Sequence, residues 1–262
     1  MMVLGLKIKY AIVDIDGVLC KHGKNIMPES IKAMNILNKN EIKVIYASGK
    51  NSWYITGGLH FSGLLKDNTI IIGENGGEIF YPYNFKIQQY KKYLKDIKKL
   101  KKEFYKKYLC NTEYGIFFSY ENYSGYVWEE PKNTIFTLFP SDIKRTPPIV
   151  LKKLFDKIIK ENSLNLYSFS HIDSAEVLQK GINKACALDI LRKLEIIEDQ
   201  SYSICFVDNI NDKELAKWVH YPIAVSNAKE EIKEIVRKKG GYISKKPYGH
   251  GVLEAIKYLF GE

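Results

Sequence analysis

The chain has 262 residues, of which 45% are apolar, and a formal net charge of +10 at pH 7. This length and apolar content allow one large domain or two smaller ones with well-filled cores, and they exclude a wholly disordered chain. No apolar run approaches the roughly 18 residues of a membrane span, and the N-terminus lacks the pattern of a signal peptide. The four cysteines show no paired spacing. We therefore expect a cytoplasmic protein with reduced cysteines and no membrane partner.

The first predicted strand covers residues 10–13 and leads directly into Asp14, Ile15, Asp16 and Gly17. A buried strand of an open α/β sheet presents its last residue at the carboxyl edge, where such sheets bind ligands. If the chain stays extended through Asp16, both carboxylates point the same way. Two carboxylates this close repel, so they need a shared proton or a bound cation. The pair is suited to a nucleophile, an acid/base group and a metal site, although Asp-Gly is also an ordinary turn signal.

The second predicted strand covers residues 43–47, after a crossover helix at 31–38, and ends in Ser48 and Gly49. A hydroxyl followed by exposed backbone N–H groups is suited to holding a phosphate. A simple strand-to-loop turn is the alternative for an isolated Ser-Gly pair.

The pattern changes after residue 81, where a lysine-rich segment, 86–107, carries apolar residues at helical spacing. Its lysines are expected on the solvated face of a helix. Strands are expected at 114–120, 134–139, 164–169 and 175–178, with a helix from Pro147-Pro148 to about residue 159. Arginine is scarce, and bidentate recognition of phosphates or bases favours arginine, so the basic charge does not favour a nucleic-acid partner. These elements predict an α+β module inserted into a parallel α/β sheet.

Lys184 precedes apolar residues at 185, 188, 191 and 194, which places it in the first turn of a predicted helix. A cation is mildly unfavourable there because of the helix dipole. Breaking this local rule is a hint of function, while a solvated lysine remains the commoner case.

The last informative strand covers residues 203–207 and ends in Asp208, with Asn211 and Asp212 close behind. Asp208 and Asp212 can both reach one hard cation, and oxygen ligands suit Mg²⁺. Either Asn211 or Asp212 could instead cap the following helix, and this role is compatible with the metal role.

Taken in order, Asp-x-Asp-Gly at 14–17, Ser48-Gly49, Lys184 and Asp208-x-x-Asn211-Asp212 resemble the motifs of the haloacid dehalogenase-like (HAD) phosphatase superfamily. Further details resemble its archaeal phosphoglycolate phosphatase branch and the Cof-type sugar phosphatases. These details are the stretches Gly73-Glu74-Asn75-Gly76-Gly77, Gly181-Ile182-Asn183-Lys184, Asn227-Ala228 and Lys246-Pro247-Tyr248-Gly249-His250-Gly251.

The resemblance implies a Rossmann-like parallel-sheet core at 1–81 and 180–262, with an inserted α+β cap of type IIB at 82–179 that closes over the site. It implies that Asp14 is the nucleophile and Asp16 the general acid/base. The implied substrate-binding residues are Ser48, Gly49, Lys184 and Asn211, and the implied Mg²⁺ ligands are Asp14, Asp16 through its backbone carbonyl, Asp208 and Asp212.

The implied function is a Mg²⁺-dependent phosphatase that acts on a small phosphorylated metabolite through an aspartyl-phosphate, with phosphoglycolate as the best single substrate. The alternatives are a sugar-phosphate or mannosyl-3-phosphoglycerate phosphatase, a phosphomutase with the same cap type, and a non-catalytic phosphometabolite-binding protein. Either a monomer or a homodimer is expected. Three positions depart from the family pattern and weaken inference about the substrate: Lys50, Val207 and Asn209.

Overall fold

The computed structural model describes residues 7–84, 86–89 and 91–261. The chain forms two compact units, one of Met1–Gln88 with Asn183–Glu262 and one of Gln89–Ile182. The inserted unit therefore begins and ends later than the expected 82–179. The reason at its first boundary is that a further strand after β4 (Glu78–Tyr81), β5 (Lys86–Gln89), extends the sheet of the first unit.

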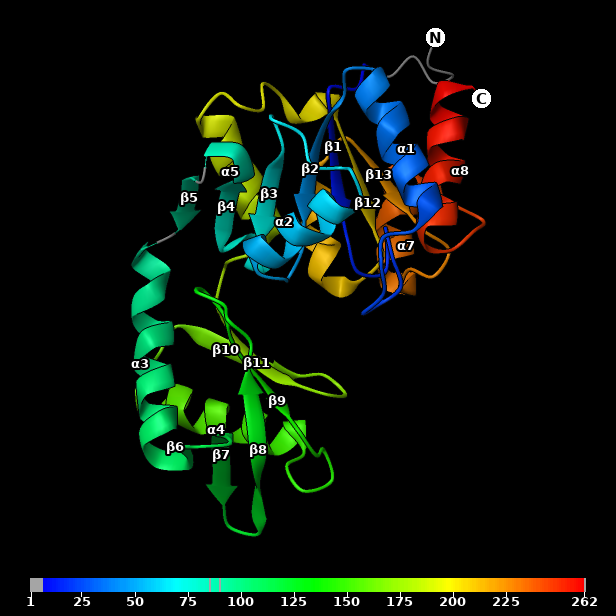
Figure 1. The fold of residues 1–262 in the computed structure, drawn as a ribbon. Helices are drawn as coiled ribbons and strands as arrows, with labels where there is room; N and C mark the ends of the chain where they lie inside the picture. Colours follow the sequence, from blue (N-terminus) through cyan, green and yellow to red (C-terminus); the bar gives the residue numbers. More distant parts are fainter. Residues whose placement is uncertain (1–6, 85, 90, 262) are drawn as a thin grey trace. The chain divides into compact units, whose positions relative to one another are not determined.

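The first unit, called the core here, is built on an eight-stranded sheet in the order β14-β13-β12-β1-β2-β3-β4-β5 (Figure 1). Neighbouring strands from β14 to β3 pair in parallel, and β4 runs antiparallel to β3. This confirms the predicted parallel α/β sheet. The remaining strands are β1 (Tyr10–Asp14), β2 (Lys43–Ala47), β3 (Ile70–Gly73), β12 (Ser203–Val207), β13 (Tyr221–Ala224) and β14 (Tyr242–Ile243).

Helices cover both faces of the core sheet. Ala11 and Val13 of β1 pack with α1 (Pro28–Lys39), α2 (Ser52–Phe61) and α8 (Tyr248–Phe260). Tyr10 and Ile12 point the other way and pack with α5 (Lys184–Lys193), α6 (Lys213–Trp218) and α7 (Glu230–Lys238). Both alternating sets of β1 are buried, as a strand between two helical layers requires. Short 3₁₀ helices occupy Glu74–Gly76 (η1), Pro82–Asn84 (η2), Gln200–Tyr202 (η3) and Ile210–Asp212 (η4).

The inserted unit has its own six-stranded sheet, in the order β10-β11-β9-β8-β7-β6, in which every neighbouring pair is antiparallel. Phe104 of α3 and Phe155 of α4 pack with Phe136 and Val177 in a separate hydrophobic core. Its elements are α3 (Lys91–Tyr108), β6 (Leu109–Thr112), β7 (Gly115–Tyr120), β8 (Tyr123–Glu129), β9 (Phe136–Pro140), α4 (Pro148–Glu161), β10 (Leu166–Ser170) and β11 (Ala175–Gln179).

The prediction of this unit was right for α4, β7, β9, β10 and β11. It was wrong at Lys86, which lies in β5 rather than in the lysine-rich helix, and it missed β6 and β8. β5 and β6 are only four residues long and β8 reads Tyr-Ser-Gly-Tyr-Val-Trp-Glu, so their pairing comes from neighbouring strands rather than from a local apolar pattern. Tyr90, expected on the apolar stripe of the helix, lies outside the described residues. Within the described chain, no helix is both long and apolar enough to cross a membrane.

Candidate active site

Asp14 and Lys184 form the centre of the site in the core. Asp14 is the last residue of β1 and Lys184 the first residue of α5. The Lys184 Nζ lies 2.7 Å from Asp14 Oδ1 and 2.7 Å from Asp212 Oδ1, and the lysine is fully buried. Two carboxylates thus compensate a cation that the helix dipole alone would disfavour. An ammonium has three N–H donors, so two are engaged here and a third is left for another acceptor.

Asp208 and Asp212 complete a cluster of three carboxylates. Asp208 follows β12, which pairs directly with β1, so both strands deliver an aspartate to the same sheet edge. Asp212 Oδ2 accepts from the backbone N–H groups of Asp208 and Asn209, each at 3.3 Å. Asp212 stands at the N-cap position of α6 but makes no side-chain hydrogen bond to that helix. Asp212 instead forms a capping box with Asn209 at the start of η4.

The donor set fits a hard divalent cation. Carboxylate oxygens of Asp14, Asp208 and Asp212 all lie within 4.8 Å of one another, and all three residues are buried. Among the described residues, Asp208 Oδ1 is a buried oxygen with no hydrogen-bond partner. Buried polar atoms are nearly always paired, so an unpaired anionic oxygen in such a cluster indicates a place for a cation. Both oxygens of Asp212 are already engaged, which makes Asp208 the better ligand of the two.

The pKa values of Asp14, Asp208 and Lys184 reflect burial and the closeness of the charged groups. Burial raises the pKa of Asp14 well above its ordinary value, and the Asp212 carboxylate raises it further against the opposing effect of Lys184. Burial and Asp212 likewise raise the pKa of Asp208 to about 6. Burial alone would lower the pKa of Lys184, but Asp14 and Asp212 outweigh it and hold the pKa above its usual range. Without a bound cation, the cluster therefore favours a proton on a carboxylate and not the loss of the lysine's proton.

The loop after β1 brings backbone close to this cluster. The strand ends at Asp14, and the Ile15 carbonyl accepts from the Leu19 and Cys20 N–H groups at 2.9 and 3.2 Å, so a tight turn begins at Ile15 and includes Asp16. Asp16 is partly exposed in this turn and forms an isolated β-bridge with Cys20. Gly17 has φ +88°, and a Cβ there would lie 2.1 Å from Asp208 Oδ2. Glycine at this position allows the close approach of the turn to Asp208.

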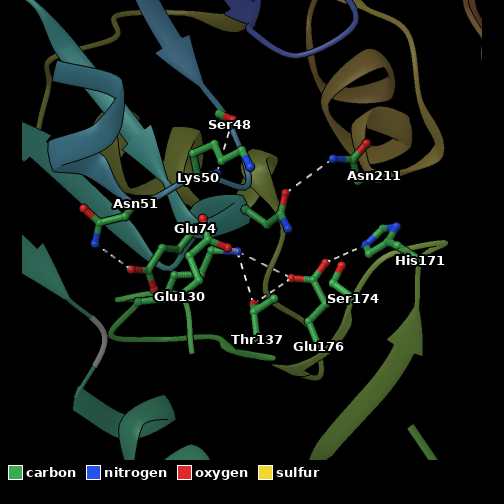
Figure 2. A network of polar contacts seen from close by, with 12 residues as sticks. Ser48, Lys50, Asn51, Glu74, Glu130, Thr137, His171, Ser174, Glu176 and Asn211 are labelled. Carbon is green, nitrogen blue, oxygen red and sulfur yellow. Dashed lines mark hydrogen bonds and ion pairs between the residues drawn. The ribbon is translucent and has the colours of Figure 1, made fainter. Parts of the chain in front are cut away.

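Ser48, Gly49 and Asn211 lie close to Asn75. Ser48 is buried after β2, and its Oγ accepts from the Lys50 N–H at 3.2 Å (Figure 2). The Ser48 carbonyl accepts from the Asn75 N–H at 3.0 Å, and Asn211 Nδ2 donates to Asn75 Oδ1 at 3.4 Å. A Cβ on Gly49 would lie 3.2 Å from the Asn75 amide. All the predicted site residues therefore lie in the core. Asp14, Asp208, Asp212 and Lys184 form a carboxylate–lysine group, Ser48, Gly49 and Asn211 belong to an amide–hydroxyl group, and Asp16 lies in the loop that follows Asp14.

Asn75 and Asn227 hold loops of the site by hydrogen bonds, and the sequence analysis had given neither residue a role. Asn75 has a positive φ of 54°, within η1, and a Cβ on the next residue, Gly76, would lie 2.2 Å from the Asn183 carbonyl beside Lys184. Asn227 donates to the Gly17 carbonyl at 2.9 Å and accepts from the Tyr248 N–H at 2.8 Å. The sequences Asn75-Gly76-Gly77 and Asn227-Ala228 could have indicated these roles. Asparagine and glycine both tolerate a positive φ, and the asparagine side chain readily hydrogen-bonds to nearby backbone groups.

Comparison with known proteins defines the class. The family of haloacid dehalogenase-like hydrolases matches residues 11–256, and the chain belongs to this family. A phosphoglycolate phosphatase from Methanosarcina acetivorans is 24% identical over 254 residues, 97% of each chain. A haloacid dehalogenase-like hydrolase from Bacteroides thetaiotaomicron has a TM-score of 0.71 at 18% identity, covering 97% of this chain and 100% of its own. The sucrose-phosphatase from Synechocystis sp. PCC6803, solved with sucrose and phosphate, has a TM-score of 0.65 at 17% identity, covering 97% and 98%.

Proposed function

We propose that this hydrolase is a Mg²⁺-dependent phosphatase that acts on a small phosphorylated metabolite through an aspartyl-phosphate on Asp14. The observation that carries the proposal is the cluster of Asp14, Asp208 and Asp212 around Lys184, with one buried Asp208 oxygen left without a partner. Three carboxylates and one ammonium, when ionised, leave net negative charge in a buried place. A divalent cation would compensate this charge and so allow an anionic phosphate to bind beside it.

In this proposal Asp14 and Asp16 perform the bond changes. An Asp14 oxygen attacks phosphorus while the bond from phosphorus to the alcohol oxygen breaks, and Asp16 donates a proton to the leaving alkoxide. Water then attacks the phosphorus of the aspartyl-phosphate, and Asp16 takes a proton from this water as phosphate leaves. Lys184 holds Asp14 Oδ1 at 2.7 Å, which fixes the carboxylate for attack through its other oxygen.

The proposed Mg²⁺ ligands are Asp14, the Asp16 backbone carbonyl and Asp208. Asp212 assists by orienting the loop that carries Asp208, since its Oδ2 holds the Asp208 N–H. When bound, the cation supplies charge stabilisation to the phosphoryl oxygens. Ser48 and the remaining Lys184 proton are the proposed donors to the phosphate, with Gly49 and Asn211 beside them.

The proposed substrate is phosphoglycolate, supported by the name of the relative from Methanosarcina acetivorans. We further propose that the inserted unit, as the cap of the HAD fold, contacts the part of the substrate other than the phosphate. The core motifs address only phosphate and metal, which all candidate substrates share, so selectivity must come from other contacts. Phosphomutase activity is the alternative, because the Asp14 and Asp16 pair serves both reactions.

The experiment is hydrolysis of p-nitrophenyl phosphate with Mg²⁺, after EDTA and after Mg²⁺ is restored, followed by a panel of phosphoglycolate, sugar phosphates and mannosyl-3-phosphoglycerate. We expect activity that EDTA removes and Mg²⁺ restores, with phosphoglycolate giving the highest kcat/KM. Full activity in metal-free enzyme would contradict the metal assignment. Transfer of phosphate to a second sugar hydroxyl without release of inorganic phosphate would identify a mutase.

A further inference from the structure

The loop between β13 and α7 lies against the backbone on both sides of the proposed metal site. The Lys229 N–H donates to the Asp208 carbonyl at 2.8 Å. The side-chain Nδ2 of Asn227 donates to the Gly17 carbonyl at 2.9 Å. Gly17 directly follows Asp16, so one short loop holds both stretches of backbone that carry proposed Mg²⁺ ligands.

Two neighbouring backbone groups fix the orientation of the Asn227 amide. The Gly17 carbonyl can only accept a hydrogen bond, and the Tyr248 N–H, whose nitrogen lies 2.8 Å from Asn227 Oδ1, can only donate one. The next residue, Ala228, is buried among the residues that pack with α5, α6 and α7, and its N–H donates to the Val225 carbonyl at 2.9 Å. The amide therefore joins Gly17 to a buried part of the core.

Gly17 is a point where the loop after β1 needs such a restraint. A Cβ there would lie 2.1 Å from Asp208 Oδ2, so the close approach of the two loops requires glycine. Glycine also has the greatest backbone freedom of all residues, so it can rotate where another residue could not. The hydrogen bond from Asn227 limits this rotation, and it does so directly beside Asp208.

The Asp16 carbonyl shares a peptide plane with the Gly17 N–H. In a trans peptide the C=O and N–H bonds point in opposite directions. The Gly17 N–H donates to the Cys20 carbonyl at 2.8 Å, so this bond sets the direction of the Asp16 carbonyl. Asn227 holds the next peptide plane along the chain. With both planes held, the backbone that follows Asp16 has one orientation.

We propose that Asn227 is a positioning residue, which acts through Gly17 to fix Asp16 both as a Mg²⁺ ligand, through its carbonyl, and as the general acid/base. The inference rests on the proposed function, in which Asn227 itself contacts neither substrate nor metal. Loss of the bond to Gly17 should leave Asp16 less well placed relative to Asp208. Mg²⁺ should then bind more weakly, and esters that need protonation of the leaving group should be affected most.

Two substitutions separate the two hydrogen bonds of Asn227. Asn227→Asp keeps an oxygen for the Tyr248 N–H but, ionised at about pH 7.5, has no hydrogen to donate to the Gly17 carbonyl, whereas Asn227→Ala loses both bonds. Asn40→Asp is the matched control. The Asn40 Nδ2 also donates to a backbone carbonyl, that of Ile36 at 2.9 Å, but at the end of α1 rather than at the carboxyl edge of the sheet.

The first measurement is Mg²⁺ binding to the protein without substrate, by isothermal titration calorimetry. Asn227→Asp should weaken binding about 10-fold or more, as expected when a group that orients a metal ligand is lost. An added carboxylate would by itself attract the cation, so its charge cannot cause this loss. Asn227→Ala should weaken binding to a similar extent, and Asn40→Asp should leave it within about twofold of wild type.

The second measurement is kcat/KM for phenyl phosphate and for p-nitrophenyl phosphate at saturating Mg²⁺. The two esters have similar shapes, but phenolate is the poorer leaving group and depends more on the proton from Asp16. Asn227→Asp should lower the ratio of the phenyl phosphate value to the p-nitrophenyl phosphate value about 10-fold or more. A smaller folded fraction would lower both values equally and leave the ratio unchanged, and Asn40→Asp should not change the ratio.

Wild-type Mg²⁺ affinity in Asn227→Asp, or equal losses for both esters, overturns the inference while the phosphatase proposal stands. Defects in Asn227→Ala that Asn227→Asp does not share also overturn it, because the residue would then serve only to hold the start of α8. Absence of Mg²⁺ binding and of hydrolysis in the wild-type protein would contradict the proposed function itself, and the inference would fall with it.

Discussion

Two lysines with buried side chains, one in each unit, bridge pairs of carboxylates, yet the groups around them differ. Lys184 of the core lies 2.7 Å from both Asp14 and Asp212, with Asp208 as a third carboxylate nearby. Lys132 of the inserted unit lies 2.8 and 3.6 Å from Glu130 and Glu176. The core cluster has an excess carboxylate, whereas the second cluster gains His171 as an additional basic group.

The comparison shows which group in each cluster is left without a partner or exposed. The core cluster leaves a buried anionic oxygen of Asp208 unpaired, so it is complete only with a cation. In the inserted unit, both Glu176 oxygens have partners, and the group left open is the half-exposed ring of His171. The first cluster is therefore suited to a cation, whereas the carboxylate–lysine pairing of the second is satisfied within its own unit.

Replacing the nucleophile should produce the largest effect and should leave the inserted unit untouched. Asp14→Asn keeps the shape and the hydrogen bond to Lys184 but supplies a poor nucleophile, so kcat should fall on the order of 10⁴-fold or more. Steady-state hydrolysis of p-nitrophenyl phosphate measures this. Asp67→Asn, an exposed aspartate in the same unit, is the matched control and should be fully active. Substantial turnover by a clean preparation of Asp14→Asn would rule out the covalent route.

Removing the excess carboxylate tests the imbalance of the core cluster. Asp208→Asn should weaken Mg²⁺ binding at least about 100-fold, and the rise of Tm on adding Mg²⁺ should disappear. Because the variant removes repulsion from Asp14 and Asp212, its metal-free Tm should be no lower than that of the wild type. Thermal scans with and without Mg²⁺ check both points. A Mg²⁺-induced shift equal to that of the wild type would exclude Asp208 as a ligand.

The positions of Asp14, Lys184 and Asp208 in the core could be predicted from the sequence because these residues follow local patterns. Asp14, Ser48 and Asp208 each come directly after an apolar strand, and Lys184 begins an amphipathic helix. The parallel arrangement brings these ends together, so a contact between residues 170 positions apart, Asp14 and Lys184, follows from topology. The engagement of both Asp212 oxygens and the turn at Ile15 depend on loop geometry, which no periodicity encodes.

The cluster of the inserted unit could not be predicted in the same way. Lys132 and Glu130 lie near the end of β8, His171 follows β10, and Glu176 lies within β11, so none ends a buried parallel strand. Their contacts depend on antiparallel register, and a shift of one residue would send Glu176 into the hydrophobic core. The strand patterns at 164–169 and 175–178 gave the elements but not this register.

A smaller effect is expected from replacing two loop glycines. The comparison separates the cost of a positive φ from the cost of a Cβ that contacts Asp208. Gly17 and Gly23 both have positive φ, +88° and +65°, but only a Cβ on Gly17 would meet Asp208 Oδ2; nothing lies within 4 Å of one on Gly23. Gly17→Ala and Gly23→Ala should each lose about 1 kcal/mol of stability. Only Gly17→Ala should also lose kcat/KM, by about 10–100-fold, because it displaces Asp208. Equal activity of the two variants would show that Asp208 can move without cost.

The smallest effect concerns the pH dependence of stability at the second cluster. The pKa of His171 is raised in the folded state, so its stabilising contribution is present below its unfolded value of about 6.5 and is lost as pH rises through the folded value. The pKa of Glu176 is lowered, so its contribution is present above its unfolded value of about 4.3 and is lost on acidification through the folded value. Both contributions are therefore present at about pH 5.5, and the His171 contribution is lost by pH 9.

Urea unfolding should show that His171→Gln is less stable than wild type at pH 5.5 by under about 1 kcal/mol, because solvent screens the exposed half of the ring. At pH 9 the two proteins should be equally stable. His220→Gln is the control at both pH values. A deficit in His171→Gln that is as large at pH 9 as at pH 5.5 would mean that the ring stabilises the unit by packing against Phe169 rather than by charge.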